Sequence, residues 1–338
     1  IQPTKYPIMS YFPGESESFK QLIGQLSNES VLVLGHRRPD GDCVGSQIAL
    51  TRFLLSLGID ARAVNHDPVP RTLSKFVADT PFGRPGEIDD SNNLVMTVDC
   101  ADHERVGEDL VKTFPKVFLN IDHHISNTKF ARYNLILPEA SATAEILAKF
   151  FFDAGFEMDK RTAEALYLGI STDTGQFCHS GTDASVFEVC RKLCDAGASP
   201  SKVAHELYER EKPGRIQLLQ KFLSTFQMEF DGKVCIGSVY EEFYLETGTQ
   251  PEDCENFVDY ARSLEGVQIG VLLENRKGAL KGSFRAKDEK FRVDLLAKHF
   301  GGGGHSCAAG FNFEGKMSDF YPQLINVLGK HLEILKVK

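Results

Sequence analysis

The sequence lacks several features that mark whole classes of protein. No stretch approaches the roughly 18 consecutive apolar residues of a membrane-spanning helix, so we expect no membrane association. The first residues show no basic segment followed by an apolar stretch, and we therefore expect no secretory signal. Internal repeats and low-complexity segments are also missing. The hydrophobic content of 42% and the charged content of 25% are typical of a soluble globular protein.

The cysteines lack the spacing of a metal or redox motif. The chain has 8 cysteines, and no two of them form a CxxC pair. Cys190 and Cys194 lie four residues apart in a predicted helix, which favours core or surface thiols over metal ligands. We therefore expect reduced thiols and a cytoplasmic location.

The chain also lacks an excess of positive charge. Its 38 Lys and Arg residues are outnumbered by 47 Asp and Glu residues, which gives a net charge of −9. Binding of long duplex DNA needs many Lys and Arg contacts, so this balance argues against it. A small anionic substrate remains compatible with the charge, because a bound cation can supply positive charge locally.

Length and pattern predict two domains, since 338 residues are many for one hydrophobic core. In the first part, strands that are apolar on both faces alternate with helices, which indicates an α/β fold with a parallel sheet flanked by helices. The later pattern, with a strand expected at 234–239, a helix at 253–264 and two strands joined by a turn at Lys277-Gly278, indicates a smaller α+β domain with a mixed sheet. Pro213 and Gly214 are interpreted as the end of the helical pattern before it. We expect the first domain over residues 1–197, an interdomain linker over 198–214 and the second domain over 215–338.

The most informative stretch joins the first predicted strand, at 31–34, to the helix that follows it. It carries His36, Asp40 and Asp42 within seven residues, and an intervening proline and glycine bend the backbone so that the three can face one point. Hard oxygen ligands with one imidazole suit Mn²⁺, Mg²⁺ or Zn²⁺. An ordinary strand-to-helix turn, with an aspartate as the helix cap, is the alternative.

Further polar side chains follow other predicted elements. Asp99 ends one strand, His123 and His124 follow another, and Asp173 lies where a helix stops. The carboxyl ends of parallel strands meet at one edge of a sheet, where ligands bind, so we expect these residues to converge with His36. Taken singly, each could be a loop, cap or turn residue.

A run of four glycines, Gly301–Gly304, precedes His305. Glycines let backbone N–H groups approach an anion closely, and His305 adds a donor. Arg285, on a predicted strand, could donate two hydrogen bonds to a phosphate. A flexible hinge is the alternative explanation of the glycines.

These motifs together resemble those of a known family. Four motifs resemble those of the DHH phosphoesterase superfamily: His36-x-x-Pro39-Asp40-Gly41-Asp42-x-x-Gly45-Ser46, Val98-Asp99 with Asp102 and Arg105, Asp122-His123-His124, and Thr172-Asp173-Thr174-Gly175. A fifth, Gly301–Gly304 with His305 and Ala308-Ala309-Gly310, resembles the signature of the DHH-associated C-terminal domain. All five occur in the family's order and cover nearly the whole chain. The size is most similar to the stand-alone oligoribonuclease and pAp-phosphatase branch.

The resemblance implies a site for two divalent cations, usually Mn²⁺, with Mg²⁺ or Co²⁺ as alternatives. One cation would be held by His36, Asp40 and Asp99, and the other by Asp42, Asp99, His123 and Asp173, with Asp99 as the bridge. The resemblance further implies catalytic roles: Asp122 would orient His123, and His124 would donate to a phosphoryl oxygen with help from Arg105. The implied substrate-binding residues are Ser46, Arg285, Gly302, Gly303, Gly304 and His305, which would act across a cleft between the domains.

The activity implied is hydrolysis of short single-stranded RNA or dinucleotides to 5′-mononucleotides, with pAp as a second substrate. A cyclic di-AMP or pApA phosphodiesterase uses the same residues and stays open. A manganese pyrophosphatase would have a basic, glycine-poor second domain, and a RecJ-type exonuclease would need further nucleic-acid-binding domains. From another class, a non-catalytic nucleotide-binding module would lack metal ligands, and none is missing here. A homodimer is a common expectation for similar proteins.

Overall fold

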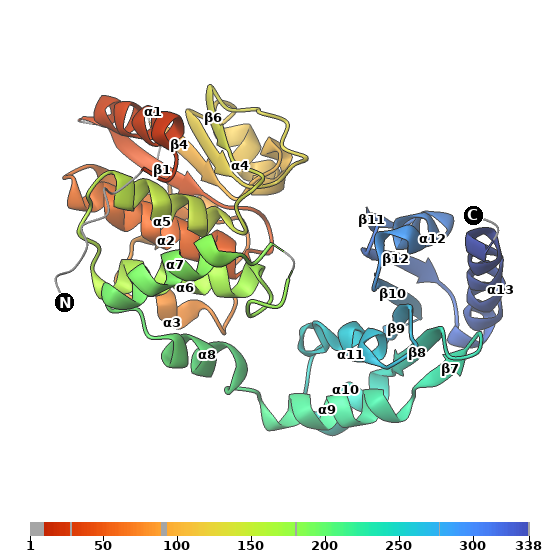
Figure 1. The fold of residues 1–338 in the computed structure, drawn as a ribbon. Coiled ribbons are helices and arrows are strands. Elements are labelled where there is room, and N and C mark those ends of the chain that lie inside the picture. The colour runs from red at the N-terminus through yellow and green to blue at the C-terminus, as the bar shows by residue number, and fades with distance from the viewer. Residues whose placement is uncertain (1–9, 28, 89–92, 180, 277, 337–338) are drawn as a thin grey trace. The chain divides into compact units, whose positions relative to one another are not determined.

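The computed structural model describes residues 10–27, 29–88, 93–179, 181–276 and 278–336. The chain divides into two compact units, Ile1–Arg210 and Glu211–Lys338 (Figure 1). The division falls within the segment 198–214 that we expected to be a linker. Part of that segment is a helix, α8 (Pro200–Tyr208), which packs against α6 (Lys160–Asp173) of the first unit.

The first unit contains a 6-stranded sheet in the order β3-β2-β1-β4-β5-β6, and every pair of neighbouring strands in it is parallel. Its strands are β1 (Ser30–Leu34), β2 (Asp60–Val64), β3 (Phe82–Gly83), β4 (Leu94–Val98), β5 (Leu119–Asp122) and β6 (Tyr133–Ile136). The helices of this unit, besides α6 and α8, are α1 (Pro13–Ile23), α2 (Gly41–Ser56), α3 (Ser74–Val77), α4 (Glu108–Thr113), α5 (Thr143–Asp153) and α7 (Ala184–Asp195). This confirms the predicted parallel sheet flanked by helices.

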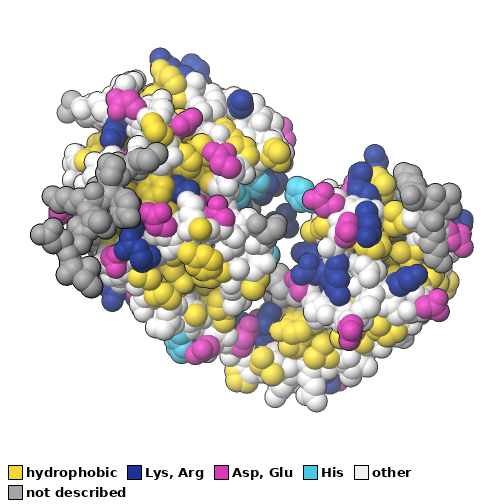
Figure 2. All heavy atoms as spheres, viewed as in Figure 1, with side chains coloured by type: hydrophobic (Ala, Val, Ile, Leu, Met, Phe, Trp, Pro, Cys, Tyr) yellow, Lys and Arg dark blue, Asp and Glu magenta, His cyan; other side chains and the backbone are white. Residues whose placement is uncertain are grey.

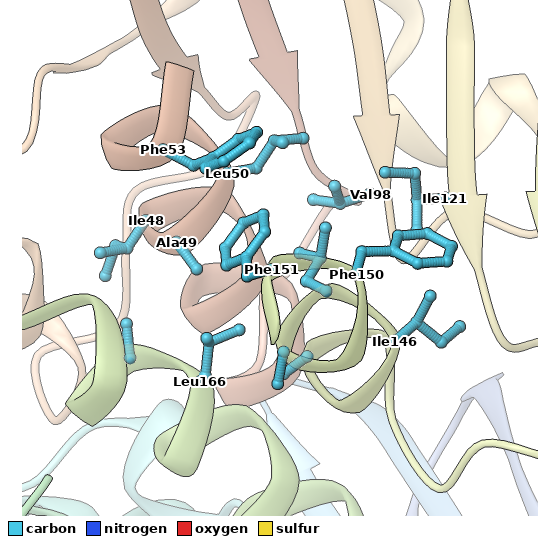
Figure 3. Close-up of a cluster of buried hydrophobic side chains, with 14 of the residues drawn as sticks. Ile48, Ala49, Leu50, Phe53, Val98, Ile121, Ile146, Phe150, Phe151 and Leu166 are labelled. Atoms are coloured by element: carbon cyan, nitrogen blue, oxygen red, sulfur yellow. The ribbon is translucent and has the colours of Figure 1, made fainter. Parts of the chain in front are cut away.

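Side chains alternate between the two faces of this sheet, and each face has its own core. On one face, Val98 and Ile121 pack with Phe150 and Phe151 of α5 and with Leu50 of α2 (Figure 3). On the other face, residues of β1 and β4 pack against α4. The strands are therefore buried on both sides, as their continuous apolar runs predict.

Helices α2 and α6 cross at very close range, because glycines stand where they meet. A Cβ atom on Gly45 of α2 would overlap the carbonyl oxygen of Ala165 in α6. A Cβ on Gly169 of α6 would overlap the methyl group of Ala144 in α5 and crowd a carboxylate oxygen of Asp42. This close packing brings the first turn of α2 next to the start of α5.

The second unit contains a mixed 6-stranded sheet in the order β11-β12-β10-β9-β8-β7, with β8 and β9 parallel and the other neighbours antiparallel. Its strands are β7 (Gln227–Glu229), β8 (Val234–Val239), β9 (Ile269–Arg276), β10 (Ala279–Ala286), β11 (Gly303–His305) and β12 (Ala308–Glu314). Its helices are α9 (Pro213–Ser224), α10 (Glu241–Thr247), α11 (Phe257–Ser263), α12 (Val293–His299) and α13 (Met317–Lys336). The predicted smaller α+β domain with a mixed sheet is confirmed.

Helices cover the two faces of the second sheet unequally. One face packs along β8, β9, β10 and β12 against α12 and α13. On the other face, residues of β8 and β9 pack with side chains of α9, α10 and α11, whereas Lys281 of β10 and Asn312 of β12 are exposed and Arg285 is half-buried. In the described residues, these helices therefore leave the β10 and β12 end of this second face partly exposed.

Several elements differ from the sequence predictions. The sequence did not predict strands β3, β6, β7 and β11 or helices α4, α9 and α10. The helix expected over 253–264 is a short 3-10 turn, Pro251–Cys254, followed by α11. The turn expected at Lys277-Gly278 includes one residue outside the described ranges.

Across the described ranges, no helix combines the length and the apolarity that crossing a membrane requires. On the face of the molecule drawn in Figure 2, acidic and basic side chains are interspersed on both units.

Candidate metal and phosphate site

The loop between β1 and α2 places His36 and Asp40 side by side. Asp40 is the N-cap of α2 and accepts a hydrogen bond from the backbone N–H of Cys43 at 3.0 Å. Its second oxygen lies 3.6 Å from Nε2 of His36. Nδ1 of His36 lies 2.8 Å from the carbonyl oxygen of Arg37, which leaves Nε2 to face the carboxylates. Helix capping and metal binding are thus compatible at Asp40, since each uses a different carboxylate oxygen.

Asp42 lies in the first turn of α2 and is buried. Its carboxylate accepts hydrogen bonds from the backbone N–H groups of Thr143 at 2.7 Å and Ala144 at 2.9 Å, at the start of α5. A helix N-terminus stabilises negative charge. Burial nevertheless raises the pKa of Asp42 well above its ordinary value, and the nearby charges of Asp99 and Asp173 add to the effect.

Asp99 directly follows β4 and lies at the centre of the cluster. Its Oδ2 is 3.4 Å from Nε2 of His36, and its Oδ1 is 3.7 Å from Nε2 of His123 and 3.6 Å from Nδ1 of His124. Its backbone is left-handed, with φ of 58°, which is uncommon for a residue other than glycine. Strained backbone of this kind gathers at functional sites, where the surrounding structure holds it in place.

Asp173, the last residue of α6, closes the other side of the cluster. Its Oδ2 lies 3.3 Å from Nε2 of His123. Burial raises the pKa of Asp173 to about 6; His123 opposes this increase, while Asp99 and Asp40 add to it. Burial and the neighbouring carboxylates together therefore outweigh the opposing effect of His123.

One predicted contact is wrong. We expected Asp122 to orient His123, but Oδ1 of Asp122 is 2.7 Å from Nδ1 of His124, while Nδ1 of His123 lies 3.3 Å from the carbonyl oxygen of Ala140. In extended chain, side chains two residues apart point to the same side, which pairs Asp122 with His124. This hydrogen bond raises the pKa of His124. Although burial opposes the change, the contacts with His124 and Asn127 lower the pKa of Asp122.

The structure also changes the expectation for Ser46. This residue was expected to touch substrate, but it is fully buried and its hydroxyl donates to Oδ1 of Asp42 at 3.3 Å. Its burial leaves no surface for a substrate, so Ser46 supports Asp42 instead.

Arg105 lies in a 3-10 turn, His103–Val106, and its carbonyl oxygen accepts a hydrogen bond from the backbone N–H of Arg37. That bond ties the Arg105 turn to the loop that carries His36.

The donor atoms fit divalent cations. Three sets of potential ligand atoms each lie within 4.8 Å of one another: Asp99 with His123 and His124, Asp42 with His123 and Asp173, and His36 with Cys43 and Asp99. All six predicted metal ligands therefore lie in one cluster, with Asp40 joined to it through His36. Burial, with a further contribution from neighbouring carboxylates, raises the pKa of Asp42 and of Asp173, and bound cations would favour the charged form of both groups.

Sequence reasoning missed three residues of this cluster. Thr143 donates its hydroxyl to Asp99 and its backbone N–H to Asp42 from more than 40 residues away, and the sequence carries no signal for either bond. Asn127 donates to Asp122 at 2.6 Å. Cys43 could have been noticed, because it directly follows Asp42 in the motif.

In the second unit, the pairing of neighbouring strands places His305 and Arg285 in one line across the sheet. His305 of β11 pairs with Ala308 of β12, which pairs with Arg285 of β10. Residues paired across antiparallel strands have their side chains on the same face, and Ala308 is the small residue between the two larger ones. His305 and Arg285 are thus two strand spacings apart, about 10 Å.

Two of the four glycines in the run belong to a strand. Gly303 and Gly304 belong to β11, the edge strand of the sheet. A Cβ on Gly302 would overlap the carbonyl oxygen of Gly310, and one on Gly304 would overlap that of Ala308. These two glycines therefore allow close approach to β12, and the outer backbone groups of an edge strand remain available to a ligand.

Comparison with known families matches both units. The model of the DHH family N-terminal domain matches residues 30–170, and that of the DHHA1 domain matches residues 231–332. The matched ranges contain every predicted metal ligand except Asp173, which lies three residues beyond the first range.

Two curated relatives and one solved structure illustrate the similarity. The chain is 29% identical over 303 residues to a bifunctional oligoribonuclease and PAP phosphatase NrnA of Thermus thermophilus, covering 89% of this chain and 90% of that protein. It is 25% identical over 311 residues to a cyclic-di-AMP phosphodiesterase PdeA of Listeria monocytogenes, covering 86% of this chain and 45% of that protein. An exopolyphosphatase-related protein from Bacteroides fragilis has the same fold, with a TM-score of 0.87 at 22% identity over 96% of this chain and 98% of that chain.

Proposed function

Because the chain belongs to the DHH family and carries a DHHA1 domain, we propose that it is a metal-dependent phosphohydrolase acting on short oligoribonucleotides and on pAp. The products are 5′-mononucleotides from the former and the dephosphorylated nucleotide from the latter. The observation that carries the proposal is the gathering of three imidazoles and the carboxylates of Asp42, Asp99 and Asp173 in one cluster. The NrnA relative matches along nearly its whole length, whereas PdeA matches over less than half of its own, which favours the NrnA activity.

The metal ligands in this proposal are those that the motifs predicted. His36, Asp40 and Asp99 would hold one cation, and Asp42, Asp99, His123 and Asp173 would hold the other. Two such cations, most often Mn²⁺, would supply activation of water and positive charge for the phosphoryl oxygens. Oxygen-rich ligand sets with imidazole suit Mn²⁺, and Mg²⁺ or Co²⁺ are the alternatives.

His124 is the proton donor to the phosphoryl group in this mechanism. The hydrogen bond with Asp122 raises the pKa of His124 and so favours the protonated imidazole, which can donate a charge-assisted hydrogen bond as negative charge develops. Asp122 acts through His124, because its carboxylate holds Nδ1 and fixes the ring. Arg105 adds positive charge at the same phosphoryl group.

The second unit binds the far end of the substrate. Arg285 offers a planar guanidinium to a phosphate, and His305 and the N–H groups of β11 offer further donors. We expect this second contact with the substrate to favour short substrates.

The test begins with metal analysis of the purified protein and a substrate panel of pApA, pAp, cyclic di-AMP and pyrophosphate. We expect Mn²⁺-dependent release of AMP from pApA and of phosphate from pAp. Preferential hydrolysis of cyclic di-AMP would replace the proposal with the phosphodiesterase alternative. No turnover with any member of the panel, in a protein that binds metal, would support a binding module.

Substitutions in the two units should affect different properties, turnover in the first unit and substrate binding in the second. His123→Ala should lose turnover with little loss of stability, since His123 is partly exposed and holds no helix terminus. Asp42→Ala is a poorer test, because it also removes the acceptor at the start of α5. His305→Ala and Arg285→Ala should raise KM for pApA while Mn²⁺ binding is unchanged, with exposed Asn312 of the neighbouring strand changed to Ala as the matched control. An unchanged KM in both variants would remove this face from substrate binding.

A further inference from the structure

The sulfur of Cys43 lies among the predicted ligands of the first cation. Sγ of Cys43, a ring nitrogen of His36 and a carboxylate oxygen of Asp99 all lie within 4.8 Å of one another. All three side chains are buried: Cys43 is 0% exposed, Asp99 is 2% and His36 is 4%. The motifs assign metal binding to Asp40 and Asp42, which both precede this residue, and give Cys43 no role.

The backbone is arranged around this sulfur. A Cβ on Gly35, the residue before His36, would overlap Sγ of Cys43, so the thiol points back at the end of β1 and occupies the space that a side chain there would need. The thiol makes a long contact, 3.8 Å, with Oε1 of Gln47 and also contacts the side chain of His36. The amide group of Gln47 is fixed independently, by donating to the carbonyl oxygens of Val33 and Val64. Loss of the thiol proton would therefore leave these two hydrogen bonds of Gln47 in place.

We propose that Cys43, His36 and Asp99 form a capture site for a thiophilic divalent cation such as Zn²⁺, Cd²⁺ or Co²⁺. Thiolate, imidazole and carboxylate together are the donor set that Zn²⁺ takes, with a fourth position left for solvent. On binding, the thiol loses its proton to solvent and the sulfur coordinates the cation. Hard cations such as Mn²⁺ gain little from sulfur and use the oxygen and nitrogen donors alone.

The consequence is competition between two kinds of cation. His36 and Asp99 serve both sets, so a thiophilic cation held through Cys43 excludes the hard cation from the first position. Zn²⁺ or Cd²⁺ therefore binds tightly and blocks the site for Mn²⁺. This inference goes beyond the proposed hydrolase activity, and its test reads metal binding rather than turnover, so the two fail independently.

The experiment uses the full-length protein, reduced, freed of metal with a chelator and titrated with Co²⁺ or Cd²⁺. A sulfur-to-metal charge-transfer band should grow to one equivalent in the unaltered chain and should be lost in Cys43→Ala. Cd²⁺ affinity should fall about tenfold or more in that variant, while Mn²⁺ affinity changes by less than about threefold. Cys100→Ala is the matched control, because Cys100 is also fully buried and directly follows Asp99; it should keep the band.

Exposed thiols at Cys178 and Cys194 contribute equally to both variants and cancel in the comparison. A full band in Cys43→Ala would overturn the proposal, as would equal loss in Cys100→Ala. Should Cys43→Ala fail to fold, as judged by circular dichroism, the unaltered protein still decides the matter. Saturating Mn²⁺ should then slow growth of the charge-transfer band by occupying His36 and Asp99, and a band indifferent to Mn²⁺ would place the cation elsewhere.

Discussion

Asp99 is the residue on which both parts of the candidate metal centre depend. Its two carboxylate oxygens lie within 4 Å of His36, His123 and His124, which come from two different loops. Its left-handed backbone and the hydrogen bond from Thr143 fix the carboxylate in that position. A central carboxylate of this kind is the arrangement that two cations sharing a ligand require, and it supports the proposed bridging role.

The residue types of this centre could be predicted from the sequence, but their pairing could not. The rule that parallel strands end at one edge predicts that His36, Asp99 and His123 converge. The pairing of Asp122 with His124 depends on local backbone direction. The bonds from Thr143 to Asp42 and Asp99 depend on the packing of α5 against α2, which a motif does not encode.

The contact between Asp122 and His124 predicts a pH effect on catalysis. Asp122→Asn keeps the shape of the side chain but removes the charge that raises the pKa of His124. We expect kcat on pAp to fall about 10- to 100-fold with little change in KM, and the basic limb of the pH–rate profile to move to lower pH. Asn127→Ala removes the other partner of Asp122 and should have a smaller effect. An unshifted basic limb in Asp122→Asn would exclude His124 as the acid.

The raised pKa of Asp173 predicts how stability depends on pH in the chelated protein. Its pKa rises from 3.8 to about 6 on folding, so the folded chain binds more protons than the unfolded chain between these values. The free energy of unfolding should therefore increase as pH falls from about 7 to about 5. The raised pKa of Asp42 acts in the same direction. Urea unfolding at several pH values measures the slope, which Asp173→Asn should flatten; a slope of opposite sign would contradict the charge distribution described here.

At the scale of elements, the site depends on how closely α2, α5 and α6 pack. Glycines at positions 45 and 169 let the three helices approach until the carboxylate of Asp42 meets the first N–H groups of α5. The position of this predicted metal ligand is thus set by helix packing as well as by its own loop.

This packing predicts the effect of a single methyl group. Gly45→Ala should reduce the free energy of unfolding by about 1–3 kcal/mol, because the added Cβ overlaps the backbone of α6. It should also weaken Mn²⁺ binding, since the shift of α2 moves Asp42. Gly24→Ala is the matched control: Gly24 has helical backbone and nothing lies within 4 Å of an added Cβ, so its stability should change by less than about 0.5 kcal/mol. Equal stability of the two variants, measured by urea unfolding, would contradict this account.

Elements with continuous apolar runs could be predicted from the sequence. Elements that have few buried residues, or that begin with a proline, could not. Strand β8 occupies the predicted residues 234–239, because six buried positions in a row carry a strong signal. Helix α9 was missed because Pro213 was interpreted as a stop, whereas proline is also favoured in the first turn of a helix. Strand β6 was missed because only one of its four residues is buried.

At the scale of the whole molecule, the residues predicted to bind metal and those predicted to bind substrate lie in different compact units. Every predicted metal ligand lies in the first unit, and Arg285 and His305 lie in the second. Each unit has its own hydrophobic core, with the change from one to the other at Arg210 and Glu211. A segment with its own core can fold by itself.

The division into two units predicts that metal binding and substrate binding can be separated by cutting the chain between them. A fragment of residues 1–210 should fold cooperatively and bind Mn²⁺ within about threefold of the affinity of the full chain, because no metal ligand is removed. It should hydrolyse pAp with a much higher KM, since the row containing Arg285 and His305 is missing. Residues 211–338 alone should fold without metal and bind AMP weakly. Isothermal titration with Mn²⁺ and with AMP measures both fragments, and loss of Mn²⁺ binding by a folded 1–210 fragment would show that the second unit contributes to the metal centre.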